Sequence, residues 1–209
     1  MLLEAQHLAR IEQYKPVIKI GNSLVEAAVA IVLRNGANGT EFLMMQRAQH
    51  PSDPWSGQMS FPGGKLEISD SNKVATAIRE TKEELGFDLF ERDYLGQLDD
   101  VYGMKANRGL SVHVSCFVFK INREVELQGN HEVADSLWLP MSYLNNVKNA
   151  YEYYHPKDTT LQMPAVLINQ DKGQVLWGLS LRMLEILYKV IGSPMQIKND
   201  WGQFIDESE

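Results

Sequence analysis

Hydrophobic positions recur with two different spacings along this chain, which predicts a mixture of helices and strands. Apolar residues fall every three or four positions over residues 2–14, 72–85 and 179–191, the pattern of helices with one buried face. A further short helix is expected over residues 141–148. Segments that are rich in aliphatic and aromatic residues, or that alternate in polarity, predict extended structure over residues 24–33, 42–45, 94–102, 110–121, 133–139, 151–154 and 165–168.

Glycine and proline mark the connections between these elements. Residues 35–39 separate the first two strands and predict a hairpin, and Gly86 suits the left-handed end of the helix before it. Residues 51–64 contain three Pro and three Gly and predict a loop. Because helices and strands mix without regular alternation, we expect an α+β fold, a mixed sheet with helices on its faces.

Composition limits the class of protein. The chain has 209 residues, 44% of them hydrophobic and 22% charged, which excludes a disordered chain, a collagen-like repeat and a coiled-coil rod. We find no internal repeat or linker, and expect one domain over residues 1–209, with a core at 24–190, a short N-terminal helix and a C-terminal tail. The net charge of −7 argues against nucleic acid as a partner.

The cellular setting is inferred from what the sequence lacks. The only cysteine, Cys116, cannot form a disulfide within the chain. The longest apolar run, residues 27–33, is far shorter than the roughly 20 residues that span a bilayer. The first residues lack the basic start and apolar block of a secretory signal. We therefore expect a cytoplasmic protein without a membrane partner.

Three acidic residues share one face of the helix predicted at 72–85. Glu80 lies three positions before Glu83 and four before Glu84, so their like charges repel. A divalent cation such as Mg²⁺ or Mn²⁺ would offset this repulsion, because it prefers carboxylate ligands. Gly63 and Gly64 would let the backbone approach such a site. The alternative, an acidic face that is merely solvated, is common when such a helix occurs without the glycine turn.

At this point a family resemblance can be stated. Residues 64–87 resemble the signature of the Nudix hydrolases, G-x5-E-x7-R-E-U-x-E-E-x-G-U, in which U is aliphatic. The chain departs from it in three places. Asp70 replaces the first Glu, eight residues instead of seven separate it from Arg79, and Thr81 fills an aliphatic position. The resemblance implies a Nudix-type α/β/α sandwich with a central mixed sheet.

The residues before this segment resemble an additional motif of the coenzyme A pyrophosphatase branch. Arg47 and the run Phe61-Pro62-Gly63-Gly64 match it, but Asp53 stands where that branch usually has a second Arg. This departure bears on the substrate and leaves the reaction type unaffected. The resemblance extends over roughly residues 24–190.

The resemblance implies metal-dependent hydrolysis of a diphosphate linkage in a nucleoside diphosphate derivative, with coenzyme A or a related nucleotide as the expected substrate. The metal ligands would be Glu80, Glu83, Glu84 and the carbonyl of Gly64, and Arg79 would orient these carboxylates without touching substrate. The general base is either a glutamate of this helix or Glu132. Asp99 and Asp100 are weaker candidates, because adjacent residues on a strand point to opposite faces.

Three residues are expected to bind substrate. Arg47 would hold a phosphate, against the alternative of a surface Arg, and Trp55 and Phe61 would stack on a base or a pantetheine arm, against the alternative of core packing.

Two other functions stay open. One is a non-catalytic Nudix-fold nucleotide-binding or regulatory module. The other, an isomerase of this fold, is disfavoured because no suitable cysteine lies near the motifs. A small-molecule nucleotide is the expected partner, a homodimer is left open, and His113 is expected to be a core histidine.

Overall fold

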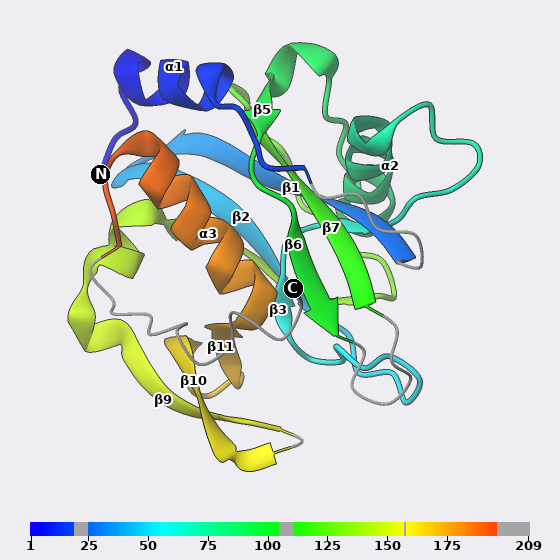
Figure 1. Ribbon diagram of the computed structural model, residues 1–209, viewed down its shortest axis with the longest axis vertical. Coiled ribbons are helices and arrows are strands. Elements are labelled where there is room, and N and C mark those ends of the chain that lie inside the picture. The colour runs from blue at the N-terminus through cyan, green and yellow to red at the C-terminus, as the bar shows by residue number, and fades with distance from the viewer. Residues whose placement is uncertain (19–24, 105–110, 157, 196–209) are drawn as a thin grey trace.

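The computed structural model describes residues 1–18, 25–104, 111–156 and 158–195. A mixed sheet of eight strands, built from these residues, forms its centre (Figure 1). β1 (Val25–Gly36) pairs with β2 (Gly39–Arg47) as the predicted hairpin and runs parallel to β7 (Ser111–Lys120). The other strands pair antiparallel: β3 (Met59–Ser60) and β8 (Val133–Pro140) with β2, β4 (Gly63–Lys65) with β1, and β5 (Tyr94–Gln97) and β6 (Val101–Met104) with β7.

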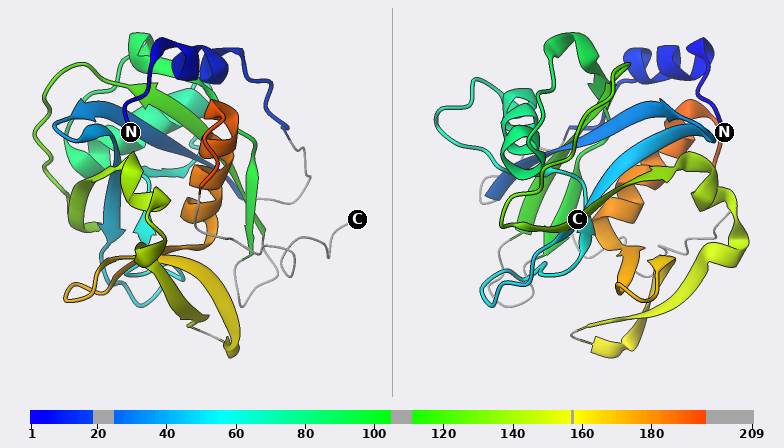
Figure 2. Two further views of the ribbon diagram at one scale, coloured as in Figure 1. Left: turned by 90° about the vertical axis from the view of Figure 1, so that its left-hand side faces the viewer. Right: turned by 180° about the vertical axis from the view of Figure 1, so that it is seen from behind.

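Helices cover both faces of this sheet (Figure 2). Successive side chains of β1 alternate between two hydrophobic clusters, as the pleat of a strand requires. On one face Ala28 and Ala30 share a cluster with residues of α2 (Lys73–Leu85). On the other face Ile31 and Leu33 share a cluster with residues of α1 (Ala5–Gln13) and α3 (Gly178–Ile191). The predicted α+β class and its two helix-covered faces are confirmed.

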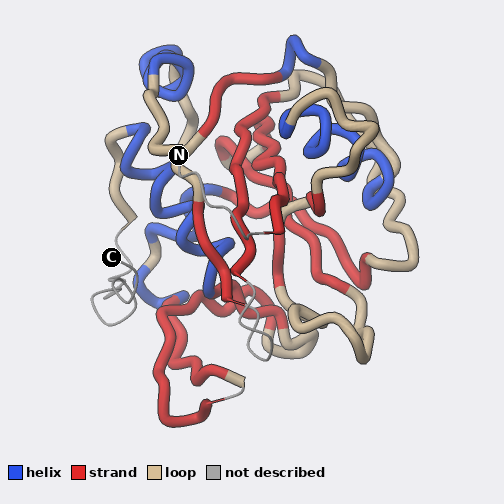
Figure 3. The backbone as a smooth tube through the Cα atoms, turned by 45° about the vertical axis from the view of Figure 1, so that its right-hand side comes forward, coloured by secondary structure: helices blue, strands red, loops and turns tan. Residues whose placement is uncertain are grey.

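A second, three-stranded antiparallel sheet lies below the first (Figure 3). It consists of β9 (Ala150–His155), β10 (Asp158–Asn169) and β11 (Gln174–Trp177). The sequence predicted parts of β9 and β10 as extended segments but not β11, which has only four residues. Trp177 ends β11 and Gly178 begins α3, so this sheet continues directly into the last helix.

Two further predictions need adjustment. Residues 94–102 form β5 and β6 instead of one strand, because the side chains between them bond elsewhere. Asp99 accepts hydrogen bonds from the Tyr14 hydroxyl and the Val17 N–H, and Asp100 bonds to buried His113 at 2.7 Å, which confirms His113 as a core residue. The helix expected at 141–148 is two short 3₁₀ helices, Met141–Asn145 and Val147–Asn149; a third spans Glu91–Asp93.

In the described part of the chain, no helix is long and apolar enough to cross a bilayer. The predicted C-terminal tail, residues 200–209, lies outside the described residues.

Candidate active site

α2 begins and ends where its sequence signals predict. The side chain of Asn72 caps the first turn by accepting a hydrogen bond from the Ala75 N–H at 2.9 Å, and Gly86 ends the helix in the left-handed conformation with φ of 77°. Ala77 and Leu85 face the sheet. Glu84 is buried on the same side of the helix, Glu80 lies beside it next to β4, and Glu83 is more exposed.

Glu80 and Glu84 lie against the two glycines of β4. The Gly63 N–H donates to Glu84 Oε2 at 2.8 Å. A Cβ atom built on Gly64 would lie 2.3 Å from Glu80 Oε1, so a side chain at this position would collide with the carboxylate. The glycines therefore bring backbone and carboxylates together, as the sequence indicated.

Glu84 is a buried carboxylate among like charges. Glu84 is only 2% exposed, and this burial raises its pKa to about 8. The negative charges of Glu80 and Glu132 act in the same direction. Burial also raises the pKa of Glu80, which the charges of Glu83 and Glu132 raise further and neighbouring Arg79 lowers. Acidic groups are therefore crowded at this point of the molecule, with Arg47 and Arg79 as the neighbouring cations.

Glu132 reaches this cluster from a distant part of the chain. The backbone N–H groups of Gln128 and Asn130 donate to the carbonyls of Leu85 and Glu84, which ties the segment before β8 to the end of α2. The Ala48 N–H also donates to the Glu132 carbonyl at 2.8 Å. The half-exposed Glu132 side chain is thereby placed near enough to influence both Glu80 and Glu84.

Arg79 connects the acidic residues to one another. Its guanidinium donates to Asp70 through Nε and Nη2 at 2.9 and 3.0 Å, and Nη1 donates to Glu80 at 3.1 Å and Glu83 at 3.0 Å. Nη2 also donates to the Lys65 carbonyl at 3.1 Å. These contacts are those of a residue that orients carboxylates.

The donor chemistry fits a hard divalent cation, although the ligands are not gathered around one position. Carboxylate oxygens and nearby backbone are the ligands such a cation prefers, and Glu84 is a buried carboxyl group with acidic neighbours, whose charged form a cation would stabilise. Within the described residues, no three His, Cys, Asp or Glu side chains already converge on a metal position. Glu80 and Glu83 instead bond to Arg79, so their side chains would have to turn to join Glu84.

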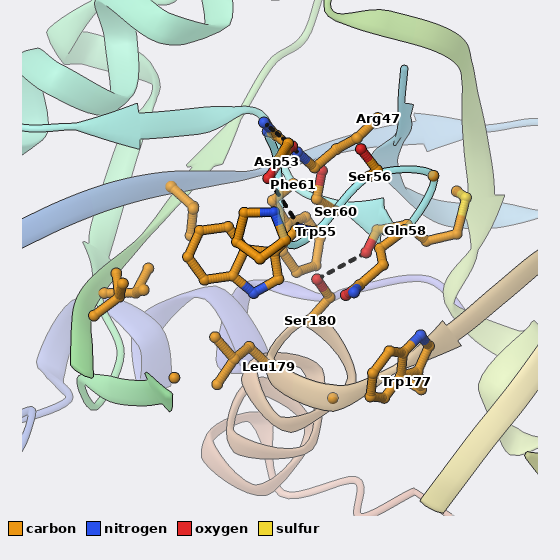
Figure 4. A pocket seen from close by; sticks show the side chains of 18 of the residues that line it. Arg47, Asp53, Trp55, Ser56, Gln58, Ser60, Phe61, Trp177, Leu179 and Ser180 are labelled. Carbon is orange, nitrogen blue, oxygen red and sulfur yellow. Dashed lines mark hydrogen bonds and ion pairs between the residues drawn. The ribbon is translucent and has the colours of Figure 1, made fainter. Parts of the chain in front are cut away.

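A cavity of about 990 Å³ opens beside the cluster, and Arg47, Gly63 and Gly64 line it. The Arg47 guanidinium lies 2.8 Å from Asp53 and 3.9 Å from Glu84 Oε1. Trp55 and Phe61 also line the cavity (Figure 4). Phe61 is 2% exposed and its ring centroid lies 6.3 Å from that of Phe42, so it packs mainly in the core.

Comparison with known proteins identifies the family. The model of the NUDIX domain matches residues 25–157, well over half of the chain. The chain belongs to the Nudix hydrolase family.

Among curated relatives, a probable Nudix hydrolase of Schizosaccharomyces pombe is 28% identical over 77% of this chain and 54% of its own. The human mitochondrial coenzyme A diphosphatase NUDT8 is 31% identical over 59% of this chain and 51% of its own. The chain thus spans about half the length of these two relatives. A crystal structure of a MutT/Nudix family protein from Enterococcus faecalis shares the fold, with a TM-score of 0.55 at 16% identity over 90% of this chain and 74% of that chain.

The structure explains how this Nudix hydrolase accommodates its departures from the family signature. Asp70 has a shorter side chain than Glu, yet both of its oxygens reach Arg79 despite the longer spacing between the two residues. Thr81 is buried at the aliphatic position because its hydroxyl donates to the Ala77 carbonyl at 2.7 Å within the helix.

Two features of this Nudix hydrolase were missed by sequence reasoning. Asp53, noted only as a missing Arg, is the ion-pair partner of Arg47, and a spacing of six residues across a loop gives no signal of such a pair. The second sheet supplies part of the cavity wall, including Trp177. Asp99 and Asp100 are engaged in the bonds described above and are not among the residues acting on the glutamates.

Proposed function

We propose that this chain hydrolyses a diphosphate linkage in a nucleoside diphosphate derivative, with coenzyme A or a related nucleotide as substrate. One observation carries the proposal. The buried Glu84 carboxyl group, which has acidic neighbours, accepts a hydrogen bond from the Gly63 N–H, and Arg47, which lines the large cavity, lies 3.9 Å from it. Nudix enzymes generally use divalent metal cations. The likeness to a coenzyme A diphosphatase supports this choice of substrate.

The proposed roles follow from the contacts. Glu80, Glu83, Glu84 and the Gly64 carbonyl would hold Mg²⁺ or Mn²⁺, which supplies neutralisation of phosphate charge and makes water more acidic. Arg79 positions the glutamates, and Arg47 exchanges its contact with Asp53 for a phosphate oxygen of the substrate. Trp55 and Phe61 form the cavity wall beside that phosphate.

Glu132 is proposed as the general base that takes a proton from the attacking water. We expect Glu132→Gln to lower kcat by roughly 10²-fold with little change in KM, because a positioned base contributes at least that much to such a reaction. Glu126→Gln, at an acid in the same segment before β8, is the matched control and should keep wild-type rates. An unchanged kcat in Glu132→Gln would assign the base to the helix instead.

The reaction itself is tested with a panel of coenzyme A, ADP-ribose, dinucleoside polyphosphates and NADH, at millimolar Mg²⁺ or Mn²⁺. Product masses from ¹⁸O-labelled water should show one heavy oxygen in one of the two phosphate products, since water attacks a single phosphorus. Tight nucleotide binding without any product would favour the alternative, a non-catalytic binding or regulatory module. Preference for nucleoside triphosphates would overturn the coenzyme A assignment.

Cytoplasmic location, a single domain over residues 1–209 and the open question of a homodimer are kept as predictions of this proposal. Fractionation of cells and the mass of the protein in solution test them directly.

A further inference from the structure

Two segments that lie far apart in the sequence line the cavity. One is the loop of residues 48–58 between β2 and β3, whose lining residues include Asp53 and Trp55. The other is the second sheet, which contributes Met163 and Trp177 among others. A contact that joins these two segments would control the shape of the cavity between them.

The side-chain amide of Gln46, the next-to-last residue of β2, makes such a contact. Its Nε2 donates to the Gly57 carbonyl in the loop at 3.2 Å, and to the Lys172 carbonyl in the turn between β10 and β11 at 3.5 Å. Its Oε1 accepts a hydrogen bond from Nε2 of Gln174, the first residue of β11, at 3.3 Å. One amide group therefore bonds to both of the segments that line the cavity.

Asp135 of β8 holds the same turn. Its Oδ2 accepts hydrogen bonds from Gln174 Nε2 at 2.7 Å and from Lys172 Nζ at 2.6 Å. The Lys172 ammonium lowers the pKa of Asp135, against the opposing effect of burial, so this group is a carboxylate at neutral pH and its hydrogen bonds are charge-assisted. Gln174 is only 2% exposed. We call Gln46, Asp135 and Gln174 the polar latch.

The polar latch is adjacent to the carboxylate cluster but does not hold its backbone. Gln46 lies opposite Asp135 in the pairing of β2 with β8, whereas the next residue, Arg47, lies opposite Val133, so β8 has one extra residue at this point. Glu132 directly precedes this bulge. A change in the side chains of the polar latch can therefore alter the cavity walls and leave the backbone at Arg47 and Glu132 in place.

We propose that the polar latch couples the two segments, so that the loop of residues 48–58 and the β10–β11 turn open and close together. The coupling has a physical cause. When the turn leaves, buried Gln174 loses its acceptors, and the Gln46 amide loses the donor that fixes its orientation toward the Gly57 carbonyl. Gln46, Asp135 and Gln174 are then positioning residues, which act on a bound molecule through the cavity walls.

Hydrogen exchange of the full chain, in EDTA and without nucleotide, tests the coupling. Gln174→Met removes both donated hydrogen bonds and keeps the length of the side chain. We expect amides of the β10–β11 turn and of the loop at residues 48–58 to lose about tenfold in protection, because a hydrogen bond is worth about that factor. The loop amides are informative because several of them bond within the loop itself, away from the substitution.

A second variant guards against a folding defect. Asp135→Asn keeps the shape of a partly exposed side chain and removes its charge, so we expect a smaller loss of protection, about threefold, in the same two segments. Asp171→Asn, at an exposed acid of the same turn, is the matched control and should leave protection unchanged.

Kinetics give a second readout, which rests on the proposed function. Gln174→Met should raise KM for the nucleotide substrate by about tenfold and change kcat by less than about twofold, because the cavity walls loosen while the glutamates of α2 stay in place. A purely structural residue would instead lower kcat in proportion to the fraction of unfolded protein.

Faster exchange confined to the β10–β11 turn would overturn the coupling. Equally faster exchange in α2 and the central strands would also overturn it, since that result would mean a general loss of stability. The exchange measurements need neither metal nor substrate. The coupling can therefore be found even if the proposed reaction fails, and turnover of coenzyme A with no change in the loop of residues 48–58 would refute the coupling alone.

Discussion

Replacing Glu84 by glutamine should lower turnover of the nucleotide substrate by roughly 10³-fold, while the folded chain becomes more stable at pH 8. The loss of rate follows from removing a carboxylate proposed to hold the cation, whose stabilisation of phosphate charge is worth several kcal/mol. The gain in stability follows because an amide at this position keeps the acceptor for the Gly63 N–H without burying a charge. Glu80→Gln should show the same loss of rate.

The direction of the pH dependence is fixed by the raised pKa. Without metal, the pKa of Glu84 rises from about 4.5 in the unfolded chain to about 8 in the folded chain. Between these values the folded state binds one more proton than the unfolded state, so the free energy of unfolding falls as pH rises. The stabilisation is complete below about pH 4.5 and is lost by about pH 8, a change of a few kcal/mol.

Urea denaturation in EDTA at several pH values between 5 and 8 measures this slope. Wild type should show it, Glu84→Gln should not, and Glu83→Gln, at an exposed position on the same helix, should retain it. Added Mg²⁺ should stabilise wild type more than Glu84→Gln. A Glu84→Gln variant that is both inactive and less stable than wild type at pH 8 would mean that Glu84 is a structural residue.

The second large effect is expected at Asp70, whose replacement by alanine should cost about 3 kcal/mol of unfolding free energy. Arg79 would lose two hydrogen bonds and its most buried partner, and a half-buried guanidinium left without its carboxylate is costly. We also expect turnover to fall by about 10- to 100-fold, since Arg79 would no longer hold Glu80 and Glu83 in place.

Acid titration adds a readout for this pair. The Arg79 guanidinium holds the pKa of Asp70 well below its usual range, so the stability that Asp70 contributes is present above about pH 4 and is lost below it. Asp70→Ala should therefore lose stability at neutral pH and flatten the wild-type decline in acid. Glu67→Ala is the matched control, because this exposed loop acid lies 3.9 Å from the same guanidinium. Equal losses of stability in Asp70→Ala and Glu67→Ala would contradict the prediction that Asp70 is the main carboxylate partner of Arg79.

Local signals account for what the sequence predicted well. The α2 helix is specified by its own apolar spacing, by Asn72 before it and by Gly86 after it, and the contacts of Arg79 with Glu80 and Glu83 are between neighbours on one helix. The α1 and α3 helices show similar periodicity. These elements need no information from elsewhere in the chain, which is why the face that carries the glutamates could be foreseen.

Long-range pairing accounts for what the sequence did not predict. β11 is too short to show a pattern by itself and exists through its pairing with β10, whose Pro164 weakens the strand signal there. Residues 98–100 depart from a strand because Asp99 and Asp100 bond to Tyr14 and His113 in other elements. The ion pair between Asp53 and Arg47 forms only once the loop that carries Asp53 has folded back onto β2.

The direct continuation of β11 into α3 ties two regions of the molecule mechanically. Trp177 forms part of the cavity wall, and the helix that starts at the next residue buries Leu181, Leu184 and Tyr188 under the sheet. With no linker between them, an occupant that fixes the Trp177 ring also restrains the first turns of that helix. Amide hydrogens in these turns should exchange more slowly with solvent when a ligand fills the cavity. Hydrogen exchange in α3 would therefore measure binding in the cavity.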